Sequence, residues 1–453
     1  MLFKRKAYDD LLAWKQGNGE SAILIEGARR TGKSTLAERF AQAEYESYLL
    51  INFETAPQEV RDIFNDYRDN VDTFFKYLLA YYGVRLERRR SLIIFDEVQR
   101  FPIARSYIKH LVADGRFDYM ETGSLISIKK NVEDILIPSE EDKIDLGPLD
   151  FEEFLWATGN TALADLIAES FESGRALPSP LHRKASQLWR EYLLVGGMPQ
   201  SVAAYLETDD FAQADRAKRR ILNLYREDIM KFGGEDASRA TAVFDAVPGQ
   251  LAKHEKKFTL ASARPGARYR EYAGAFFWLE DARMVNLCLN VTDPNVGLDL
   301  SAERSNFKCY LGDTGLLSTL AFGDRKETLD SLYRNVLFGK ISVNEGMLVE
   351  NAVAQQLRAN GHKLRFYSHR NDAKAADTME IDFLIVREYA NAGLKPRLSP
   401  LEVKSSNRFS TRSLDKFKAK FGKRVGTELV LIPKPFSIEG DRMQLPLYMG
   451  FCL

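Results

Sequence analysis

The sequence contains little cysteine, no long apolar run and no excess of charge of either sign. Its 453 residues include three cysteines, Cys288, Cys309 and Cys452, which have no metal-ligand spacing and cannot all pair with one another. A reducing compartment is therefore the simplest expectation. No apolar stretch approaches the ~18 residues of a membrane-spanning helix, and the N-terminal residues lack the apolar segment of a secretory signal. These absences predict a cytoplasmic protein that has no membrane partner.

The formal net charge is zero, because 64 basic side chains balance 64 acidic ones. Overall charge therefore favours no nucleic acid or membrane as a partner, and such a partner has to be argued from local patches. The hydrophobic content of 45% and the charged content of 28% are ordinary for a globular chain. At about 150 residues per domain, the length predicts about three domains.

The most informative stretch is SAILIEGARRTGKSTLAERF, residues 21–40. The apolar run Ala22–Ile25 predicts a buried strand, and the pattern over Thr35–Ala43 predicts a helix. Between them, Gly27 to Ser34 fits the spacing GxxxxGK[ST] without a mismatch. A chance turn rich in glycine is the alternative. The flanking strand and helix favour a phosphate-binding loop.

Each residue type in this loop suits a phosphate ligand. The glycines let successive backbone N–H groups point at phosphate oxygens, and the N-terminus of the helix adds positive charge. Lys33 can reach the outer phosphates, and the Ser34 hydroxyl can bind Mg²⁺. The sequence therefore predicts a site for ATP and Mg²⁺. The predicted nucleotide-binding residues are Gly27, Ala28, Arg29, Arg30, Thr31, Gly32, Lys33, Ser34 and Thr35.

A pair of acidic residues follows a second apolar strand, Ser91–Phe95. In a nucleotide hydrolase, Asp96 would hold the Mg²⁺ ion together with Ser34, and Glu97 would polarise the attacking water. The pair predicts hydrolysis, with Lys33 and Glu97 as catalytic residues. A strand at residues 117–124 ends in polar side chains, of which Thr122 or Ser124 can sense the γ-phosphate. An ordinary turn explains the same residues equally well.

Strands alternate with helices through the first third of the chain. This alternation predicts an α/β domain with a mostly parallel sheet, helices on both faces and the nucleotide at the carboxyl ends of the strands. The predicted strands are residues 22–25, 47–53, 91–95, 117–124 and 143–149.

The middle third is predicted to be helical up to about residue 235, with a break at the glycine pair before Pro199. Arg226 fits an arginine finger supplied to a neighbouring subunit of a homo-oligomer, although a solvated helical arginine is commoner.

From residue 236, helices are followed by a β-ribbon, which is the outline of a winged helix. We expect Pro248 to interrupt the first of these helices. A basic cluster here suits a DNA backbone, and nearby acidic residues dilute it. Its members are Lys253, Lys256, Lys257, Arg264, Arg268 and Arg270.

The last third carries a second constellation of charged residues. Glu350 lies on a predicted amphipathic helix, residues 344–358. Asp382 lies in a strand at 380–386, and Glu402 and Lys404 lie two apart in a strand at 400–404, which places them on one face. If Asp382 lies opposite Glu402, carboxylates that suit Mg²⁺ meet an ammonium group that can stabilise a phosphate.

This D…ExK pattern predicts a PD-(D/E)XK, restriction-endonuclease-like fold. Its metal ligands would be Glu350, Asp382 and Glu402, and its catalytic residues Glu402 and Lys404. Charged strand edges are common, so the fold and the cleavage activity are separate predictions. Downstream, eight basic residues favour a polyanion, and a solvated helical face explains them equally well. They are Lys404, Arg408, Arg412, Lys416, Lys418, Lys420, Lys423 and Arg424.

Nine motifs in a fixed order give the chain a family resemblance. They are GARRTGKST, LIIFDEVQR, METGS, PLDFEEFL, YLLVGGMPQ, YLGDTGLL, EGMLVENAV, MEIDFLI and PLEVKSS. The chain resembles a large prokaryotic family of AAA-type ATPases whose members carry a C-terminal domain of unknown function that looks like a restriction endonuclease. It departs from that family at residues 143–147, where an arginine-containing strand is expected.

The resemblance implies an AAA-type P-loop ATPase domain at residues 1–150 and a helical region at 151–235. A winged-helix-like domain at 236–325 and a PD-(D/E)XK nuclease-like domain at 326–453 follow. The predicted function is an ATPase whose nucleotide state controls a nuclease-like domain that binds or cleaves DNA with Mg²⁺. The alternative is an ATP-dependent regulatory switch that binds a protein partner and whose nuclease-like domain is inactive.

Overall fold

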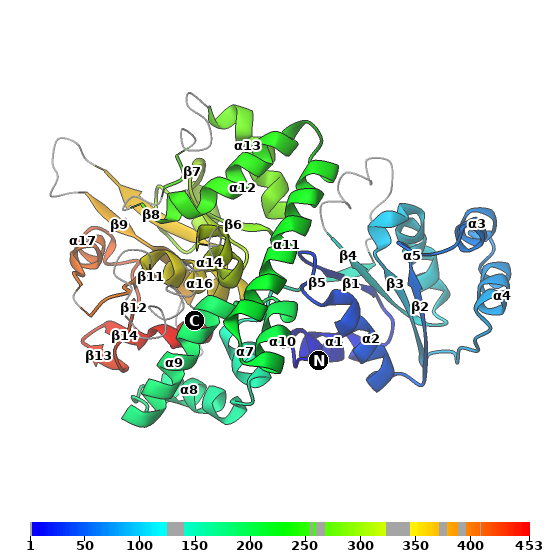
Figure 1. The fold of residues 1–453 in the computed structure, drawn as a ribbon, viewed down its shortest axis with the longest axis horizontal. Coiled ribbons are helices and arrows are strands. Elements are labelled where there is room, and N and C mark those ends of the chain that lie inside the picture. Colours follow the sequence, from blue (N-terminus) through cyan, green and yellow to red (C-terminus); the bar gives the residue numbers. More distant parts are fainter. Residues whose placement is uncertain are drawn as a thin grey trace. The chain divides into compact units, whose positions relative to one another are not determined.

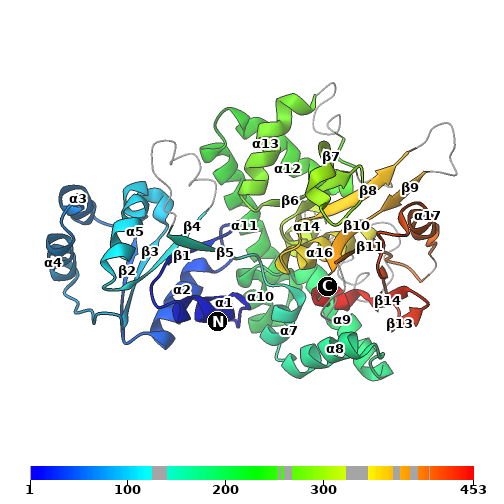
Figure 2. The ribbon, with the colours of Figure 1, turned by 180° about the vertical axis from the view of Figure 1, so that it is seen from behind.

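The computed structural model describes residues 2–124, 140–253, 257–259, 268–322, 345–370, 378–387, 396–407 and 409–453. Lys256, Arg264, Arg408 and the predicted domain boundary at 325/326 lie outside these residues. The chain forms two compact units (Figure 1; Figure 2 from behind). Unit 1 comprises Met1–Gly147 with Asp281–Arg283, and unit 2 comprises Pro148–Glu280 with Met284–Leu453. The division of unit 2 into three domains stays a prediction.

Unit 1 contains a five-stranded sheet in the order β2-β3-β4-β1-β5, and every pairing in it is parallel. The predicted parallel sheet is therefore confirmed. Its strands are β1 (Ala22–Glu26), β2 (Ser47–Asn52), β3 (Ser91–Asp96), β4 (Asp118–Gly123) and β5 (Glu141–Asp145). The last strand begins and ends earlier than residues 143–149, where the sequence predicted it.

Helices cover both faces of this sheet, because alternate strand residues point to opposite sides. Ala22 and Leu24 join an apolar cluster with Phe64 and Phe74, whereas Ile23 joins a second cluster built around α2. The helices are α1 (Ala7–Gln16), α2 (Lys33–Glu44), α3 (Gln58–Tyr67), α4 (Val71–Tyr82) and α5 (Pro102–Asp114), with the short η1 (Val98–Arg100) after β3. Residues 58–82 form two helices rather than one, because the Asn70 side chain caps α4 by accepting from the Thr73 N–H group.

Unit 2 begins with helices. They are α7 (Phe151–Ala157), α8 (Thr161–Ser173), α9 (Ser179–Val195), α10 (Pro199–Thr208), α11 (Phe211–Phe232), η2 (Gly234–Asp236), α12 (Ala237–Leu251) and α13 (Tyr269–Asp281). The predicted break after α9 is present, and a Cβ on Gly197 would lie 1.9 Å from the Leu149 carbonyl oxygen. The predicted interruption at Pro248 is wrong. Pro248 lies inside α12, only three residues before the helix ends at Leu251. The N–H group that proline lacks therefore removes one hydrogen bond from the last turn and does not interrupt the helix.

The predicted β-ribbon is β6 (Val285–Val291) with β7 (Ala302–Leu311), and the two strands are antiparallel as expected. The ribbon belongs to a larger sheet in the order β7-β6-β8-β9, with β8 (Arg365–His369) and β9 (Met379–Ile381). The predicted winged-helix region therefore shares a sheet with the last third of the chain.

A second sheet in unit 2 has the order β10-β11-β12-β14-β13. Its strands are β10 (Phe383–Arg387), β11 (Arg397–Val403), β12 (Glu428–Ile432), β13 (Ser437–Glu439) and β14 (Arg442–Pro446). The remaining elements are η4 (Leu298–Ser301), α14 (Thr314–Phe322), α16 (Glu345–Ala359), α17 (Arg412–Phe421) and η6 (Leu447–Cys452). The single strand predicted at 380–386 is divided at Asp382 into β9 and β10, which lie in different sheets. No helix among the residues described has the length and apolarity that a bilayer crossing requires.

Candidate nucleotide site and acidic cluster

The loop between β1 and α2 has the backbone that a phosphate-binding loop requires. Gly32, the N-cap of α2, has φ 94°, in the left-handed region that glycine adopts without strain. A Cβ on Gly27 would lie 2.3 Å from the Leu146 carbonyl oxygen, so only glycine fits there. Thr31 Oγ1 donates to the Ala28 carbonyl at 3.0 Å and closes the loop. The loop is therefore shaped by its own glycines and Thr31 and by the neighbouring Leu146 carbonyl group.

Lys33 is buried within this loop. Its Nζ donates to the carbonyl oxygens of Ala28 at 2.9 Å and Gly27 at 3.2 Å. Burial lowers the pKa of Lys33 to about 8, against the opposing effect of Glu97 and Asp96. Neutral carbonyl groups thus hold an ammonium group at the point where the triphosphate is expected.

Asp96, at the end of β3, collects polar groups from three other elements. Its Oδ1 accepts from Ser34 Oγ at 2.6 Å and also from the Thr122 hydroxyl on β4. Its Oδ2 accepts from Asn52 Nδ2 at 2.7 Å, from the end of β2. A carboxylate beside a hydroxyl is the pair of oxygen ligands that Mg²⁺ takes next to a nucleotide. Ser34 and Asp96 therefore fit the predicted ion.

Glu97 has φ 54°, a left-handed conformation that is uncommon for a residue other than glycine. Its N–H group donates to Thr122 Oγ1 at 3.3 Å, and the Gln99 amide donates to its Oε2. The residue after Asp96 is thus turned out of the strand and held by two side chains. Thr122 contacts both acidic residues, and its predicted role as γ-phosphate sensor stays a prediction.

Arg5 and Asn52 are contacts of this site that sequence reasoning missed. The buried Arg5 guanidinium donates to the Thr31 carbonyl at 2.9 Å and to the Gly147 carbonyl at 2.7 Å. Asn52 could have been found, because it is the last residue of the strand beside β3, whereas nothing in the sequence marks Arg5. Of the remaining predicted contacts, Arg29 pairs with Glu54 at 3.8 Å, and Arg30 and Thr35 are exposed.

The second constellation gathers in unit 2. Phe383 of β10 pairs with Leu401 of β11, so Asp382 lies opposite Glu402, as the prediction required. Asp382 Oδ2 accepts from the Val403 N–H group at 2.9 Å, and Lys404 Nζ lies 2.8 Å from Glu402 Oε2. Burial raises the pKa of Glu402, and Lys404 opposes that shift.

Sequence reasoning missed the residue at the centre of this cluster, Lys308 of β7. Its Nζ lies 2.7 Å from Glu380 Oε1, 3.3 Å from Glu350 Oε1 and 3.4 Å from Asp382 Oδ1. Burial alone would lower the pKa of Lys308, and these three carboxylates raise it well above its usual value. We name Lys308, Glu350, Glu380, Asp382, Glu402 and Lys404 the acidic cluster. The sequence carries no signal for Lys308, because β7 comes from the predicted winged-helix region.

The acidic cluster does not fit a divalent metal as its side chains stand. Among the residues that the structure describes, no three His, Cys, Asp or Glu side chains are arranged to hold a metal ion. The Lys308 ammonium lies against oxygens of both Glu350 and Asp382, and Lys404 lies against Glu402. The metal-binding role of these three carboxylates stays a prediction, and this arrangement weighs against it.

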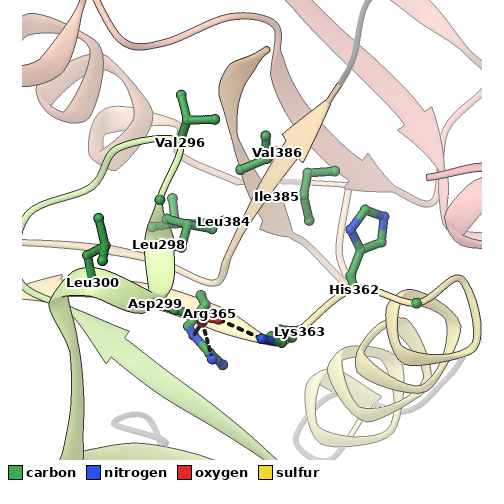
Figure 3. A pocket seen from close by; sticks show the side chains of 12 residues that line it. Val296, Leu298, Asp299, Leu300, His362, Lys363, Arg365, Leu384, Ile385 and Val386 are labelled. Carbon is green, nitrogen blue, oxygen red and sulfur yellow. Dashed lines mark hydrogen bonds and ion pairs between the residues drawn. The ribbon is translucent and has the colours of Figure 1, made fainter.

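Two other features of unit 2 do not contribute to either centre. A cavity of about 280 Å³ has apolar walls from β10 and a rim on which Asp299 pairs with Lys363 at 2.7 Å and with Arg365 (Figure 3). None of the residues lining it is a predicted site residue. Arg226, the candidate arginine finger, pairs with Asp245 of α12 at 2.9 Å. This pair favours the structural interpretation of Arg226.

Residues 19–155 match a family described as an AAA domain. Residues 186–327 and 345–448 match two domains of unknown function, DUF8612 and DUF4143. A comparison with curated proteins gives no match. With the geometry above, the first match defines unit 1 as an AAA-type P-loop ATPase domain.

Three solved structures are distantly similar. C. elegans PCH-2 is 13% identical with a TM-score of 0.28, covering 49% of this chain and 70% of its own. Cdc6p from Pyrobaculum aerophilum is 13% identical with a TM-score of 0.27, covering 74% and 96%. The RuvB Holliday junction branch migration motor of Thermotoga maritima is 11% identical with a TM-score of 0.28, covering 62% and 89%. TM-scores this low carry no argument about the function of this chain.

Proposed function

We propose that this protein is an ATP-dependent switch, in which ATP binding and hydrolysis by unit 1 control the binding of a protein partner by a nuclease-like region of unit 2. Lys33 binds the outer phosphates, Ser34 and Asp96 hold Mg²⁺, and Glu97 orients the attacking water. Mg²⁺ would supply charge neutralisation on the phosphates. The hydrogen bonds that Asp96 accepts from Ser34 and Asn52, and Glu97 from Gln99, support these roles, because they fix both carboxylates before a ligand arrives.

The order of elements supports a nuclease-like region. Helix α16 with Glu350 is followed by β8, by β9 and β10 around Asp382, and by β11 with Glu402 and Lys404. Strand β10 is antiparallel to β11, and β12, reached through α17, is parallel to it. A helix, strands that end near an acid, and a strand with ExK occur in the order expected of a PD-(D/E)XK fold.

The observation that carries the choice of a protein partner is how the basic stretch after β11 is used. Lys418 lies 3.0 Å from Asp441 and 3.2 Å from Glu428, and Arg424 pairs with Asp293. Lys416 donates to the Thr378 carbonyl and Lys420 to the Tyr367 hydroxyl, each at 2.9 Å. DNA binding draws its affinity from cations that contact phosphates. Basic side chains that already contact groups of this chain contribute less to the affinity for DNA.

Mg²⁺-dependent DNA cleavage is the second candidate. The observation that favours it is the meeting of Asp382, Glu402 and Lys404 on neighbouring strands. The position of Lys308 argues against cleavage, because its ammonium group already lies against two of the predicted metal ligands.

Incubation with supercoiled plasmid separates the two candidates. The wild type and an Asp382→Ala variant are assayed with Mg²⁺ or Mn²⁺, with and without ATP, while phosphate release is followed in the same tube. The switch predicts ATP turnover without cleavage. Nicking by the wild type that the variant lacks would establish the nuclease instead.

Control of unit 2 by nucleotide is tested by amide hydrogen exchange. A Glu97→Gln variant, which should hold ATP without hydrolysing it, is compared with and without ATP. We expect altered exchange in residues 345–453, and no change in a Lys33→Ala protein. Identical exchange in both states of the Glu97→Gln protein would remove the proposed control.

A further inference from the structure

Lys308 is the most completely enclosed charge of the acidic cluster. Its side chain is 1% exposed, and its Nζ lies 5.2 Å from the centre of the Phe366 ring. Glu350 Oε1, one of its partners, also accepts from the Tyr310 hydroxyl at 2.5 Å. Asp382 is fixed as well, because its other oxygen accepts from the Val403 N–H group. The ammonium group and its carboxylates are therefore held by surrounding groups on several sides.

We propose that Lys308 is a built-in cation that takes the place of the divalent metal expected at this cluster. The inference deepens the proposed function, because it explains why a nuclease-like region would bind without cutting. It concerns the cluster alone and is independent of ATP hydrolysis.

The geometry makes the lysine and a metal ion mutually exclusive. Mg²⁺ binds carboxylate oxygens at about 2.0–2.1 Å and Ca²⁺ at about 2.3–2.6 Å. An ion shared by Glu350 Oε1 and Asp382 Oδ1 would therefore lie in the space that the ammonium now fills, 3.3 and 3.4 Å from those oxygens. Two cations so close, away from water, repel each other strongly.

Glu380 adds a carboxylate that the predicted motif does not contain. It makes the shortest contact with Lys308, at 2.7 Å. The cluster thus provides three carboxylates around one ammonium. With that ammonium removed, we expect the three carboxylates to move closer together around a hard divalent ion, an arrangement that they do not have in this structure.

A second buried lysine of unit 2 supplies the matched control. Lys218 is fully buried, and its Nζ donates to the Leu194 carbonyl at 2.5 Å and contacts Ser318 Oγ at 3.4 Å. The Leu194 carbonyl and the Ser318 hydroxyl thus contact Lys218, whereas three carboxylates lie against Lys308. Lys218→Met removes the same charge at a place where the carboxylates that act on it, those of Asp215 and Asp313, also accept from neutral donors of the chain.

The experiment measures Mn²⁺ binding by calorimetry and electron paramagnetic resonance in the full chain without nucleotide. The proteins are the wild type and the variants Lys308→Met, Lys218→Met, Asp382→Asn and Lys308→Met/Asp382→Asn. Any Mn²⁺ bound at Ser34 and Asp96 is common to all of them. We expect Lys308→Met alone to gain one Mn²⁺ per chain and to lose it in the double variant. Saturating Mn²⁺ should raise the Tm of Lys308→Met by about 3 °C or more beyond the change in wild type.

Two results would overturn the inference. One is Mn²⁺ binding by the wild type that Asp382→Asn removes, and the other is a folded Lys308→Met protein that gains no ion. If Lys308→Met folds only when Mn²⁺ is present, that rescue supports the inference, and if it does not fold at all, the comparison of wild type with Asp382→Asn decides. Wild-type metal binding without plasmid cleavage would overturn the inference and leave the proposed switch standing.

Discussion

The nucleotide site of unit 1 and the acidic cluster of unit 2 are each built around a buried lysine, and the partners of the two lysines differ. Lys33 is held by two backbone carbonyl groups, and burial lowers its pKa to about 8. Lys308 is held by three carboxylates, which raise its pKa. An ammonium group that contacts only neutral groups is stabilised when an anion binds to it. One that already contacts carboxylates gains little further stabilisation from another anion.

The comparison distinguishes a binding site from a structural ion cluster. At the nucleotide site, the carboxylates of Asp96 and Glu97 accept hydrogen bonds from neutral side chains, so that a Mg²⁺ ion and a phosphate would complete the charges there. In the acidic cluster, the carboxylates already form ion pairs with Lys308 and Lys404. Each prediction below changes one side of this comparison.

The largest effect is expected for Glu97→Gln. Loss of the group that orients the attacking water should slow ATP hydrolysis by about 10²- to 10⁴-fold while ATP binding persists. Phosphate release measures the first quantity and calorimetry the second. Glu59→Gln, on the exposed side of α3, is the control and should hydrolyse ATP as the wild type does. An unchanged rate in Glu97→Gln would remove Glu97 from its role.

Lys308→Met is expected to destabilise unit 2 by about 3–5 kcal/mol, because three carboxylates would lose their shared cation. Lys218→Met should cost less, about 1–3 kcal/mol, since the Leu194 carbonyl group loses a donor while Asp215 and Asp313 keep neutral donors of the chain. Urea unfolding monitored by tryptophan fluorescence compares the two. Equal losses would mean that the carboxylates around Lys308 add nothing beyond ordinary burial.

Gly27→Ala tests the shape of the phosphate loop. The new Cβ would meet the Leu146 carbonyl oxygen at 2.3 Å, so the loop must shift, at a cost of about 1–3 kcal/mol. Gly83→Ala is a useful contrast, since its φ of 64° also strains an alanine but nothing lies within 4 Å of the new Cβ. We expect weaker ATP binding only in Gly27→Ala, measured by calorimetry. Wild-type ATP affinity in that variant would show that the loop tolerates a side chain there.

The smallest effect is a pH dependence from Lys218. Burial lowers its pKa from 10.5 to about 8, against Asp215 and Asp313, so between these values the unfolded chain binds more protons than the folded one. The contribution of Lys218 to the free energy of unfolding therefore rises with pH between these two values. The wild type should gain about 1 kcal/mol relative to Lys218→Met between pH 7 and pH 9. A difference that stays constant with pH would show that Lys218 keeps its usual pKa.

Much of unit 1 could be predicted from the sequence because its signals are local. The strand, loop and helix around Lys33 are consecutive, and Asp96 follows directly on an apolar strand. The contacts of Arg5 could not be derived in the same way, because they join segments 26 and 142 residues apart in the sequence. Tertiary packing, which no short pattern encodes, brings these segments together.

In unit 2 the sequence singled out Asp382, Glu402 and Lys404, and the pairing of β10 with β11 placed the first opposite the second. The break of the strand at Asp382 was missed, because the apolar alternation continues through it. Lys308 was missed because it comes from β7, 42 residues before Glu350 in the chain. Only the sheet that joins β7 to β8 and β9 brings it to the cluster.

The sequence by itself determined the phosphate-binding loop, the acidic pair that follows β3 and the parallel character of the first sheet, because these depend on neighbouring residues, on short apolar runs and on the alternation of strands with helices. Only the tertiary structure decided which charges the acidic cluster contains. A buried carboxylate takes whichever cation the fold places beside it, and here that cation comes from a distant strand.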